Sequence, residues 1–232
     1  MNRGLYSGVE AMAAAERRLE SIATNLANVS VNGYKRRSTS AQGFDAVLKG
    51  RLERHVRTRT RTDFSQGVVE ATGEPFDLAL DGAGFFAVET PRGEAYTRGG
   101  RFHIDSNGLL QTQDGLPVAW EGARGQVDPL GEQVRVDPEG QVWQGEAQVG
   151  RLRLVGFAEP ARLRPDRNGY LHAPGGLQEV AHEAEVRQGA LERSNVSAVD
   201  EMVALIATQR SYESAARLMS AIEQGYRRLT AR

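Results

Sequence analysis

The sequence predicts an α+β protein in which long N- and C-terminal helices pair as a coiled-coil-like bundle, with an antiparallel all-β domain inserted between them. Three observations predict this fold. Apolar residues recur at helical spacing in residues 1–35 and 187–232. Most of the 26 glycines and all 8 prolines lie in the middle of the chain, between short runs of β character. Residues 58–62 alternate threonine and arginine with a period of two, which is typical of extended chain.

The N-terminal helix is expected within residues 1–35. Its apolar positions follow one another at steps of three, four or seven residues: Leu5, Val9, Met12, Leu19, Ile22, Leu26 and Val29. Alanine, the strongest helix former, fills many of the positions between them. Asn32-Gly33 is a typical helix end, so we expect the helix to stop there.

The C-terminal helix is expected within residues 187–232, with Ser194, Asn195 or Ser197 as its cap and two acids in its first turn. Its apolar stripe comprises Met202, Leu205, Tyr212, Met219 and Tyr226, widened by Ile206, Leu218, Ile222 and Leu229. Pairing of the two helices is expected to bury Leu5, Leu19, Leu26, Met202, Leu205 and Met219, at about 1.5–3 kcal/mol for each large side chain. Polar residues interrupt both stripes and are expected to fix the register of the pair: Asn25, Asn28, Asn195, Gln209 and Arg210.

Between the helices we expect a basic extended linker over residues 36–68 and a β-rich domain over residues 69–186. Strands are predicted at residues 77–80, 84–88, 101–104 and 149–155. Glycine-containing turns are predicted at residues 82–84, 106–108 and 139–140. A β domain is therefore expected between the two halves of a helical one.

Composition limits the classes of function. The chain has no cysteine, which excludes disulfides and thiolate metal sites. No apolar run approaches the roughly 18 residues that a membrane span needs. A basic and then apolar leader is also missing, so any export is expected to use a route that cleaves no signal peptide. The net charge of −1 combines a basic N-terminal quarter with an acidic remainder, which suits binding of nucleic acid or of further copies of the chain.

No catalytic, cofactor-binding or metal-binding residues are predicted. The four histidines lack the spacing of metal ligands. The sequence from Asp105 to Gly108 resembles part of a calcium loop, but a hairpin turn explains it better. Glu74, Asp77 and Asp81 could serve as paired carboxylates, although solvated charges at a strand end are the simpler interpretation, because no nucleophile or oxyanion donor accompanies them. We therefore expect a protein that is not an enzyme and has no small-molecule substrate.

A basic stretch leaves nucleic-acid binding as the alternative function. Its cations are Lys49, Arg51, Arg54, Arg57, Arg59 and Arg61, with Glu53 as the single acid among them. Such a run can bind phosphates. However, no aromatic residues are interleaved for base stacking, and no DNA-binding motif lies nearby. A solvated or subunit-facing segment is favoured, and no nucleic-acid partner is expected.

Four ordered motifs resemble those of the flagellar rod, hook and hook-basal-body proteins. The first is Asn25-Leu26-Ala27-Asn28 followed by Gly33-Tyr34-Lys35, after an opening at residues 4–8 that also resembles this family. Residues 72–88 and 96–102 are similar to the family's strand–turn–strand and the segment after it. The C-terminal signature is represented by Leu191, Glu192, Ser194, Asn195 and Val196, and then by Gln209, Arg210, Tyr212 and Glu213.

The resemblance implies a structural subunit of the bacterial flagellar basal-body rod that polymerises through its terminal helices into the axial drive shaft. It implies copies of the same chain and other rod and hook proteins as partners, a periplasmic location in the basal body, and no cofactor. It also implies delivery by the flagellar type III export apparatus, for which Phe44 and Leu48 resemble an export-gate motif, although a small packed turn explains them equally well. Within the family, the short linker and residues 149–155 resemble the proximal rod protein more than the distal one.

Overall fold

The computed structural model describes residues 3–48, 51–166 and 168–230, with side chains at residues 8–41, 58–166, 168–225 and 227. The chain divides into two compact units. The helical unit contains the chain up to Val29, Arg36–Asp63 and the chain from Val196 onward. The β unit contains Ser30–Lys35 and Phe64–Asn195. Each unit is described by itself.

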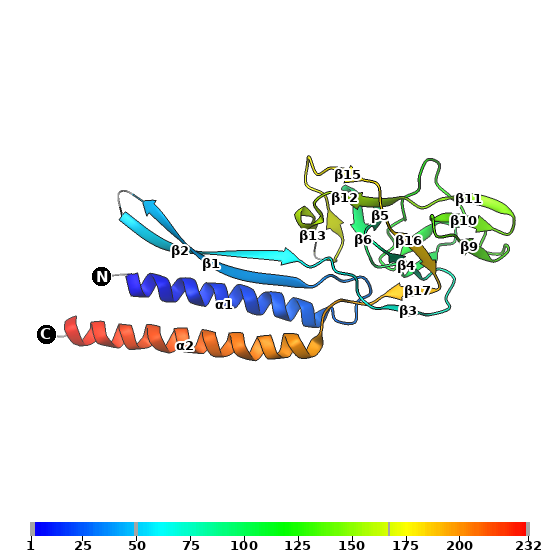
Figure 1. Ribbon diagram of the computed structural model, residues 1–232. Coiled ribbons are helices and arrows are strands. Elements are labelled where there is room, and N and C mark those ends of the chain that lie inside the picture. Colours follow the sequence, from blue (N-terminus) through cyan, green and yellow to red (C-terminus); the bar gives the residue numbers. More distant parts are fainter. Residues whose placement is uncertain (1–2, 49–50, 167, 231–232) are drawn as a thin grey trace. The chain divides into compact units, whose positions relative to one another are not determined.

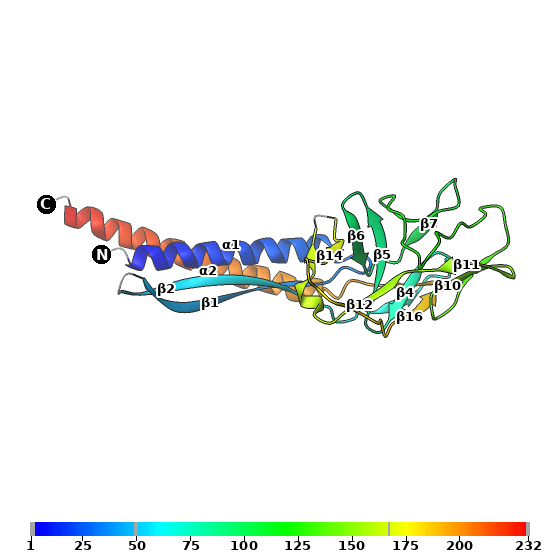
Figure 2. The same cartoon turned by 90° about the horizontal axis from the view of Figure 1, so that it is seen from above.

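The helical unit consists of α1 (Arg3–Ala27), α2 (Ala198–Thr230) and the strands β1 (Arg37–Leu48) and β2 (Arg51–Thr62). α1 packs against α2 and against both strands (Figures 1 and 2). The prediction of a long helix at each end of the chain is thus confirmed. The amphipathic pattern accounts for this packing, because a long helix gains most of its stability by burying one face.

α1 is shorter than predicted at its C-terminal end, whereas α2 begins after one of the three residues predicted to cap it. α1 ends at Ala27, six residues before Gly33, where Asn28 N donates to Asn25 O over 3.1 Å in a tighter turn. α2 begins at Ala198 and the predicted cap at Ser197 is confirmed, because Asp200 N donates to Ser197 Oγ over 3.3 Å. Further back in the sequence, Glu185–Gln188 and Ala190–Glu192 form strands, and the residues between Glu192 and the cap are in neither a strand nor a helix.

The segment predicted as a linker is extended, but it is a hairpin rather than a linker. β1 and β2 pair antiparallel without interruption from Arg37 opposite Thr62 to Leu48 opposite Arg51. The Oγ1 atoms of Thr39 and Thr60 form a cross-strand hydrogen bond of 2.9 Å. The sequence shows the alternation of β2 clearly, whereas β1 carries serine, alanine and glycine and has no apolar alternation that would reveal a strand.

The β unit is built from short strands whose pairings are all antiparallel in the described residues. The strands are β3 (Val69–Ala71), β4 (Leu78–Asp81), β5 (Phe85–Thr90), β6 (Gly93–Thr97), β7 (Phe102–Ile104), β8 (Leu110–Thr112), β9 (Val134–Val136), β10 (Gln141–Gln144), β11 (Ala147–Arg151), β12 (Leu154–Phe157), β13 (Arg164–Pro165), β14 (Leu171–His172), β15 (Glu179–Val180), β16 (Glu185–Gln188) and β17 (Ala190–Glu192), with a 3-10 turn at Pro160–Arg162. One sheet has the order β13-β14-β6-β5-β12-β15 and another the order β11-β10-β9, while β16 pairs with β4, β17 with β3 and β7 with β8.

The core of the β unit lies on both faces of β5. Phe86 faces one apolar cluster, where its ring meets Phe102 edge-on at 5.2 Å between centroids. Phe85 faces a second cluster that includes Tyr96 and Phe157. Residues 85–88 are therefore a continuous apolar run because the strand is covered on both sides.

The strands predicted near residues 77–80, 84–88 and 101–104 are confirmed as β4, β5 and β7. The predicted strand at residues 149–155 is instead divided between β11 and β12. The chain changes sheet there, because β11 pairs with β10 while β12 pairs with β5 and β15. The predicted turns are present, with positive φ at Gly82, Gly108 and Gly140.

Candidate assembly surface

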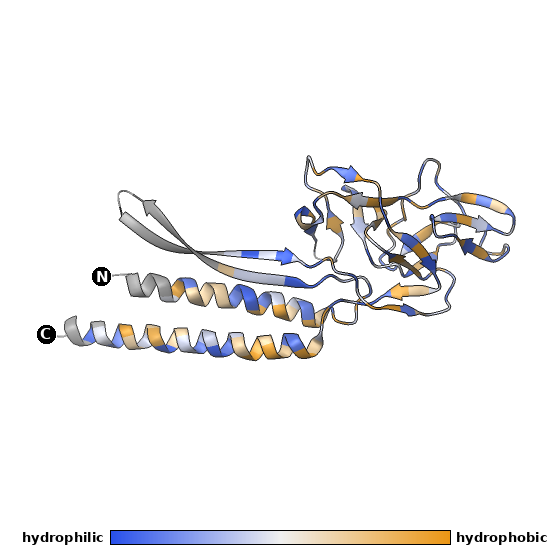
Figure 3. Cartoon of the chain, viewed as in Figure 1, coloured by the Kyte–Doolittle hydropathy of each residue, from blue (hydrophilic) through white to orange (hydrophobic). Residues whose placement is uncertain are grey.

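One face of α2 is buried in the helical unit, and the face beside it is apolar and exposed. Glu201 and Thr208 are buried on the inner face. Val199, Met202, Val203 and Ile206, which we call the α2 stripe, are each exposed by 53% to 71%. Their spacing of i, i+3, i+4 and i+7 places them on one side of the helix. Figure 3 shows apolar residues recurring along α2 from its first turns.

The position of Met202 corrects the prediction that this residue packs against the N-terminal helix. Successive residues are separated by about 100° around a helix. Because Glu201 points inward, Met202 is turned out of the interface and is exposed. The stripe seen in the sequence therefore combines two faces, one that packs within the chain and one that does not.

α1 contributes small residues to the helix pair. Gly8, Ala15 and Ile22 are buried at steps of seven, and Leu19, Leu26, Leu205 and Met219 are half-buried. A Cβ added at Gly8 would lie 2.3 Å from Met219 Sδ, so glycine makes room for the methionine. The side chain of Leu5, which was predicted to join this contact, lies outside the described residues.

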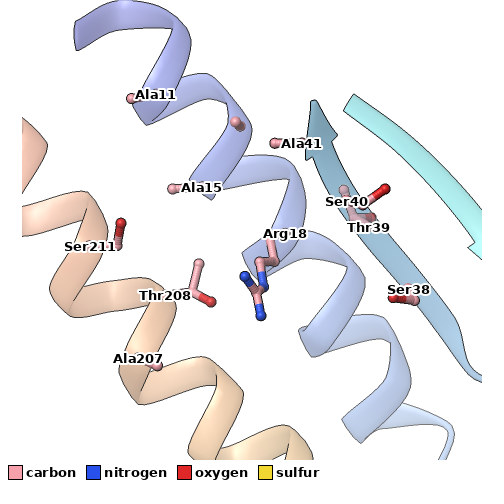
Figure 4. Close-up of a pocket in the computed structure, with 11 residues that line it drawn as sticks. Ala11, Ala15, Arg18, Ser38, Thr39, Ser40, Ala41, Ala207, Thr208 and Ser211 are labelled. Atoms are coloured by element: carbon pink, nitrogen blue, oxygen red, sulfur yellow. The ribbon is translucent and has the colours of Figure 1, made fainter. Parts of the chain in front are cut away.

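A groove of about 720 Å³ is formed by α1, α2 and β1 (Figure 4). We call it the small-residue groove, because every lining residue except Arg18 is an alanine, serine or threonine: Ala11, Ala14, Ala15, Arg18, Ser38, Thr39, Ser40, Ala41, Ala207, Thr208 and Ser211. Figure 4 shows the α1 residues between those of α2 and those of β1. Short side chains of this kind let another backbone approach closely.

Asn25 fixes the start of the hairpin rather than the register of the two helices. It is fully buried, and its Nδ2 donates to Arg37 O over 2.8 Å while its Oδ1 accepts from Arg37 N over 2.9 Å. Ser21 Oγ donates to the same carbonyl over 3.0 Å. The predicted register role is therefore corrected: the asparagine aligns α1 with β1, because its amide can satisfy both backbone groups of one residue.

Replacing Asn25 with leucine is expected to destabilise the helical unit by about 1–3 kcal/mol, since it removes both hydrogen bonds from a buried position. Thermal unfolding of the full chain measures this effect. Asn28→Ala is the matched control, because Asn28 Nδ2 donates only within its own helix in the contacts described here, to Thr24 O over 2.7 Å. Equal unfolding temperatures for the two variants would contradict this role of Asn25.

A second buried polar contact joins α2 to the residue before β1. Glu201 is fully buried, and its Oε1 accepts a hydrogen bond from Arg36 Nε over 2.6 Å. Among the described residues, Oε2 of Glu201 has no hydrogen-bond partner. Arg36 is partly exposed, so the ion pair joins the buried side of the first turn of α2 to a residue at the protein surface.

In the β unit, Lys35 of the N-terminal motif contacts the buried carboxylate of Glu192, which belongs to the C-terminal motif. Glu192 Oε1 accepts from Lys35 Nζ over 2.5 Å and from Gly67 N over 2.9 Å. Glu192 Oε2 accepts from Arg98 Nη1 over 3.2 Å. All three charged side chains are at least 94% buried. Burial lowers the pKa of Arg98, and the charge of Glu192 opposes this effect.

Gly33 lies beside this network and cannot be exchanged freely. Its φ is +70°, and an added Cβ would lie 2.2 Å from the backbone carbon of Arg98. Its N–H donates to Glu192 O over 2.7 Å. Glycine is required because it combines a left-handed backbone with a close backbone contact.

The remaining predicted motif residues are distributed over both units. Leu191 and Val196 are buried, Tyr34, Ser194 and Tyr212 are half-buried, and Ala27 and Arg210 are exposed. Asn195 Nδ2 donates to Ser65 O over 3.0 Å. This contact joins two segments of the β unit, whereas Asn195 was predicted to fix the register of the helix pair. Gln209 reaches Glu213 on its own helix at 3.5 Å. Phe44 and Leu48 fall in β1, but their side chains lie outside the described residues.

Two of the three acidic residues considered for catalysis have separate partners. Asp77 faces Arg101 and Asp81 faces Arg187, each at 3.8 Å. Asp105 Oδ1 accepts from Leu109 N over 2.8 Å and from Asn107 N over 2.9 Å. These backbone hydrogen bonds lower the pKa of Asp105, and they confirm the hairpin turn rather than a calcium loop.

Other classes of site find no support in the part of the chain that the structure describes. No three His, Cys, Asp or Glu side chains there gather so that they could hold a metal ion. No helix among the described residues is long and apolar enough to cross a membrane. Arg59 and Arg61 of the basic stretch are exposed, opposite Ser40 and Ser38 on the paired strand.

Comparison with known protein families matches three segments of the chain. Residues 5–35 match the family described as "Flagella basal body rod protein". Residues 79–144 match "Flagellar hook protein FlgE/F/G D1 domain". Residues 187–231 match "Flagellar basal body rod FlgEFG protein C-terminal". These segments include most of α1, the centre of the β unit and all of α2.

Relatives match nearly the whole length of the chain. The "Flagellar basal-body rod protein FlgF" of Caulobacter vibrioides is 36% identical over 228 residues, covering 94% of this chain and 93% of the relative. The FlgF protein of Mesorhizobium japonicum is 34% identical, covering 94% and 92%. The "Flagellar basal-body rod protein FlgG" of Bacillus subtilis is 28% identical over 260 residues, covering 97% and 96%.

Proposed function

Because the chain belongs to the family of flagellar basal-body rod proteins, which are structural components of the flagellum and not enzymes, we propose that it polymerises through its terminal helices to form part of the axial drive shaft. Its partners in this role are copies of the same chain and other rod and hook proteins. α1 and α2 form a coiled-coil-like pair within each copy, and neighbouring copies cover the faces that this pair leaves open.

The α2 stripe is the observation that carries this proposal. Its four apolar side chains are exposed and contiguous on one side of the helix. Monomeric proteins rarely leave such a patch uncovered unless it is an interaction site. Covering one large apolar side chain contributes about 1.5–3 kcal/mol, so four of them favour association strongly.

The small-residue groove supplies a surface of complementary shape in the same unit. Its alanines, serines and threonines allow a helix of a neighbouring copy to approach closely. The stripe and the groove are different surfaces, so a contact between them is heterologous. A heterologous contact whose rotation does not close into a ring repeats into a helical filament, which is the arrangement that a rod requires.

The location and the route of delivery form part of the same proposal. We place the chain in the periplasmic part of the basal body, delivered by the flagellar type III export apparatus without cleavage of a signal peptide. The role of Phe44 and Leu48 in export stays a prediction. The identity to the two FlgF relatives is higher than to the FlgG relative. Assignment to the proximal rod stays a prediction.

Purified basal bodies test this function directly. An epitope-tagged full-length chain, expressed from its own locus in place of the untagged one, is expected in the rod fraction after the membrane and the filament have been removed. A tagged cytoplasmic protein of similar size is the control for carry-over. Absence of the tagged chain from the rod fraction of motile cells would overturn the proposal.

A further inference from the structure

The outward face of the β1–β2 hairpin carries two arginines that lack an acidic partner in the described part of the chain. The other face packs on α1, where Thr58 accepts a hydrogen bond from Arg17 (Figures 1 and 2). Side chains alternate between the two faces of a strand, so Arg59 and Arg61 point away from α1. Both are exposed, and neither forms an ion pair with a described residue. We call these two residues the arginine pair.

The neighbouring strand leaves the arginine pair open. β1 places Ser40 opposite Arg59 and Ser38 opposite Arg61. Both serines are exposed and short, and a hydroxyl group carries no charge that could balance a guanidinium. An arginine presents its donors in a planar fork that fits a carboxylate. The face therefore suits a partner with two carboxylates at the spacing of alternate strand residues, which is roughly 7 Å.

A pair of carboxylates with this spacing lies on the β unit. Burial alternates along β16 and the two residues before it: Ala184 and Val186 are buried, whereas Glu183, Glu185 and Arg187 are exposed. The three exposed side chains therefore share one face of this extended segment. We call Glu183 and Glu185 the glutamate pair.

The charge of the glutamate pair is not balanced by the described residues around it. Glu185 lies directly opposite Asp81 of β4, and like charges in this arrangement repel each other. Arg187 reaches Asp81 at 3.8 Å, whereas neither Glu183 nor Glu185 forms an ion pair with a described residue. A cation supplied by a partner would relieve the repulsion. This face thus has two negative charges available for a partner.

The arginine pair and the glutamate pair match each other in charge and in spacing. Each occupies alternate positions of an extended segment, so two ion pairs form together when the two faces meet. Their separation follows that of the whole sequence, which is basic in its N-terminal quarter and acidic in the remainder. A nucleic acid fits the hairpin less well, because the described side chains of β1 and β2 include no aromatic ring that would stack on a base.

We infer that the arginine pair of one copy docks on the glutamate pair of a neighbouring copy. Every copy carries both surfaces, so the contact is heterologous and extends from one copy to the next. Complementary charges mainly set the specificity and the orientation of an association, whereas burial of the α2 stripe supplies affinity. The inference rests on the proposed function, since it requires copies of the chain to assemble, and it gives the basic stretch a role in that assembly.

Charge reversal in two full-length copies tests the contact. The first copy carries Arg59→Glu with Arg61→Glu, and the second carries Glu183→Lys with Glu185→Lys. Expressed alone, each copy places like charges against each other, so its incorporation into the rod is expected to fall by about tenfold or more. Expressed together in the same cells, the two copies offer opposite charges to each other, and incorporation of both is expected to recover.

Recovery on mixing distinguishes a contact between copies from one within a copy. An ion pair inside one chain would be broken in both copies, and mixing would not restore it. Arg92→Glu and Glu74→Lys make the same charge changes at other exposed positions and are expected to leave incorporation unchanged. Thermal unfolding of each purified copy reports its folding, and the single reversals Arg59→Glu and Glu185→Lys replace any double variant that unfolds.

Chemical cross-linking measures the proximity of the two surfaces, and the lack of native cysteines gives a clean background. Arg59→Cys and Glu185→Cys copies with different tags are expressed in the same cells, and their basal bodies are treated with a short bismaleimide. A linker is needed because long ion-paired side chains hold their backbones too far apart for a disulfide. A product with both tags is expected. Thr60→Cys, exposed on the opposite face of β2, replaces Arg59→Cys as the control.

The outcomes separate this inference from the proposed function. If the reversed copies do not recover on mixing, or if cross-linking is no stronger than that of the control, the inference fails, and the proposed function stands as long as the unsubstituted chain is found in the rod fraction. If the unsubstituted chain is absent from the rod fraction, both fail.

Discussion

Replacing Glu192 with glutamine is expected to lower the unfolding temperature of the full chain by about 10 °C. The substitution removes a carboxylate that contacts both Lys35 and Arg98, so both buried cations lose this ion pair. Breaking a buried ion pair by removing one partner costs about 3–5 kcal/mol. For a chain of this size, each kcal/mol corresponds to roughly 2–4 °C. Differential scanning calorimetry measures the shift.

Glu185→Gln is the matched control for this experiment. Glu185 lies in β16 and is exposed, so loss of its charge is expected to change the unfolding temperature by no more than about 1–2 °C. A third variant, Lys35→Met, removes one of the two cations and is expected to be less harmful than Glu192→Gln, because Arg98 keeps its partner. If Glu192→Gln unfolds at the same temperature as Glu185→Gln, the network does not stabilise the β unit.

The double substitution Val203→Asp with Ile206→Asp is expected to abolish incorporation into the rod without unfolding the chain. Both positions are more than half exposed in the α2 stripe, so the monomer tolerates the charges. In an assembled rod the same carboxylates would be buried without partners, which costs several kcal/mol for each. Circular dichroism of the monomer and a swimming assay of cells that carry the variant report the two effects.

Ser214→Asp on the same helix is the control, because Ser214 is exposed and lies about two turns beyond Ile206, the last residue of the stripe. Cells that carry this control are expected to swim normally. Normal swimming with the double variant would show that the stripe is not part of the assembly surface. Loss of helical content in the monomer would show that the stripe packs within the chain.

Much of the fold could be predicted from local sequence patterns. The heptad-like steps of both ends indicated the two helices, and the apolar run at residues 85–88 with its glycine turns indicated a buried strand. The sequence predicts extended chain in residues 36–68 but not the pairing of β1 with β2, because β1 shows no alternating apolar pattern of its own. Pairing depends on the partner strand and on the helix beneath, and neither is encoded in a short window.

The candidate surface was harder to predict, since periodicity does not distinguish a face that packs within the chain from one that packs outside it. Met202 and Leu205 belong to the same sequence stripe, yet the first is exposed and the second is half-buried. The Asp200-Glu201 pair was interpreted as helix-end charge, and the burial of Glu201 became evident only with its partner Arg36 in place. The partnership of Arg98 with Glu192 joins residues 94 positions apart, which no spacing rule predicts.

Thiol labelling of Val203→Cys is the most direct test of the claim that copies of this chain cover the α2 stripe. The single cysteine is expected to react rapidly with a maleimide in the free monomer and to be strongly protected in isolated basal bodies. Ser214→Cys is expected to react in both states. Equal reactivity of Val203→Cys in the monomer and in the basal body would contradict assembly through this face.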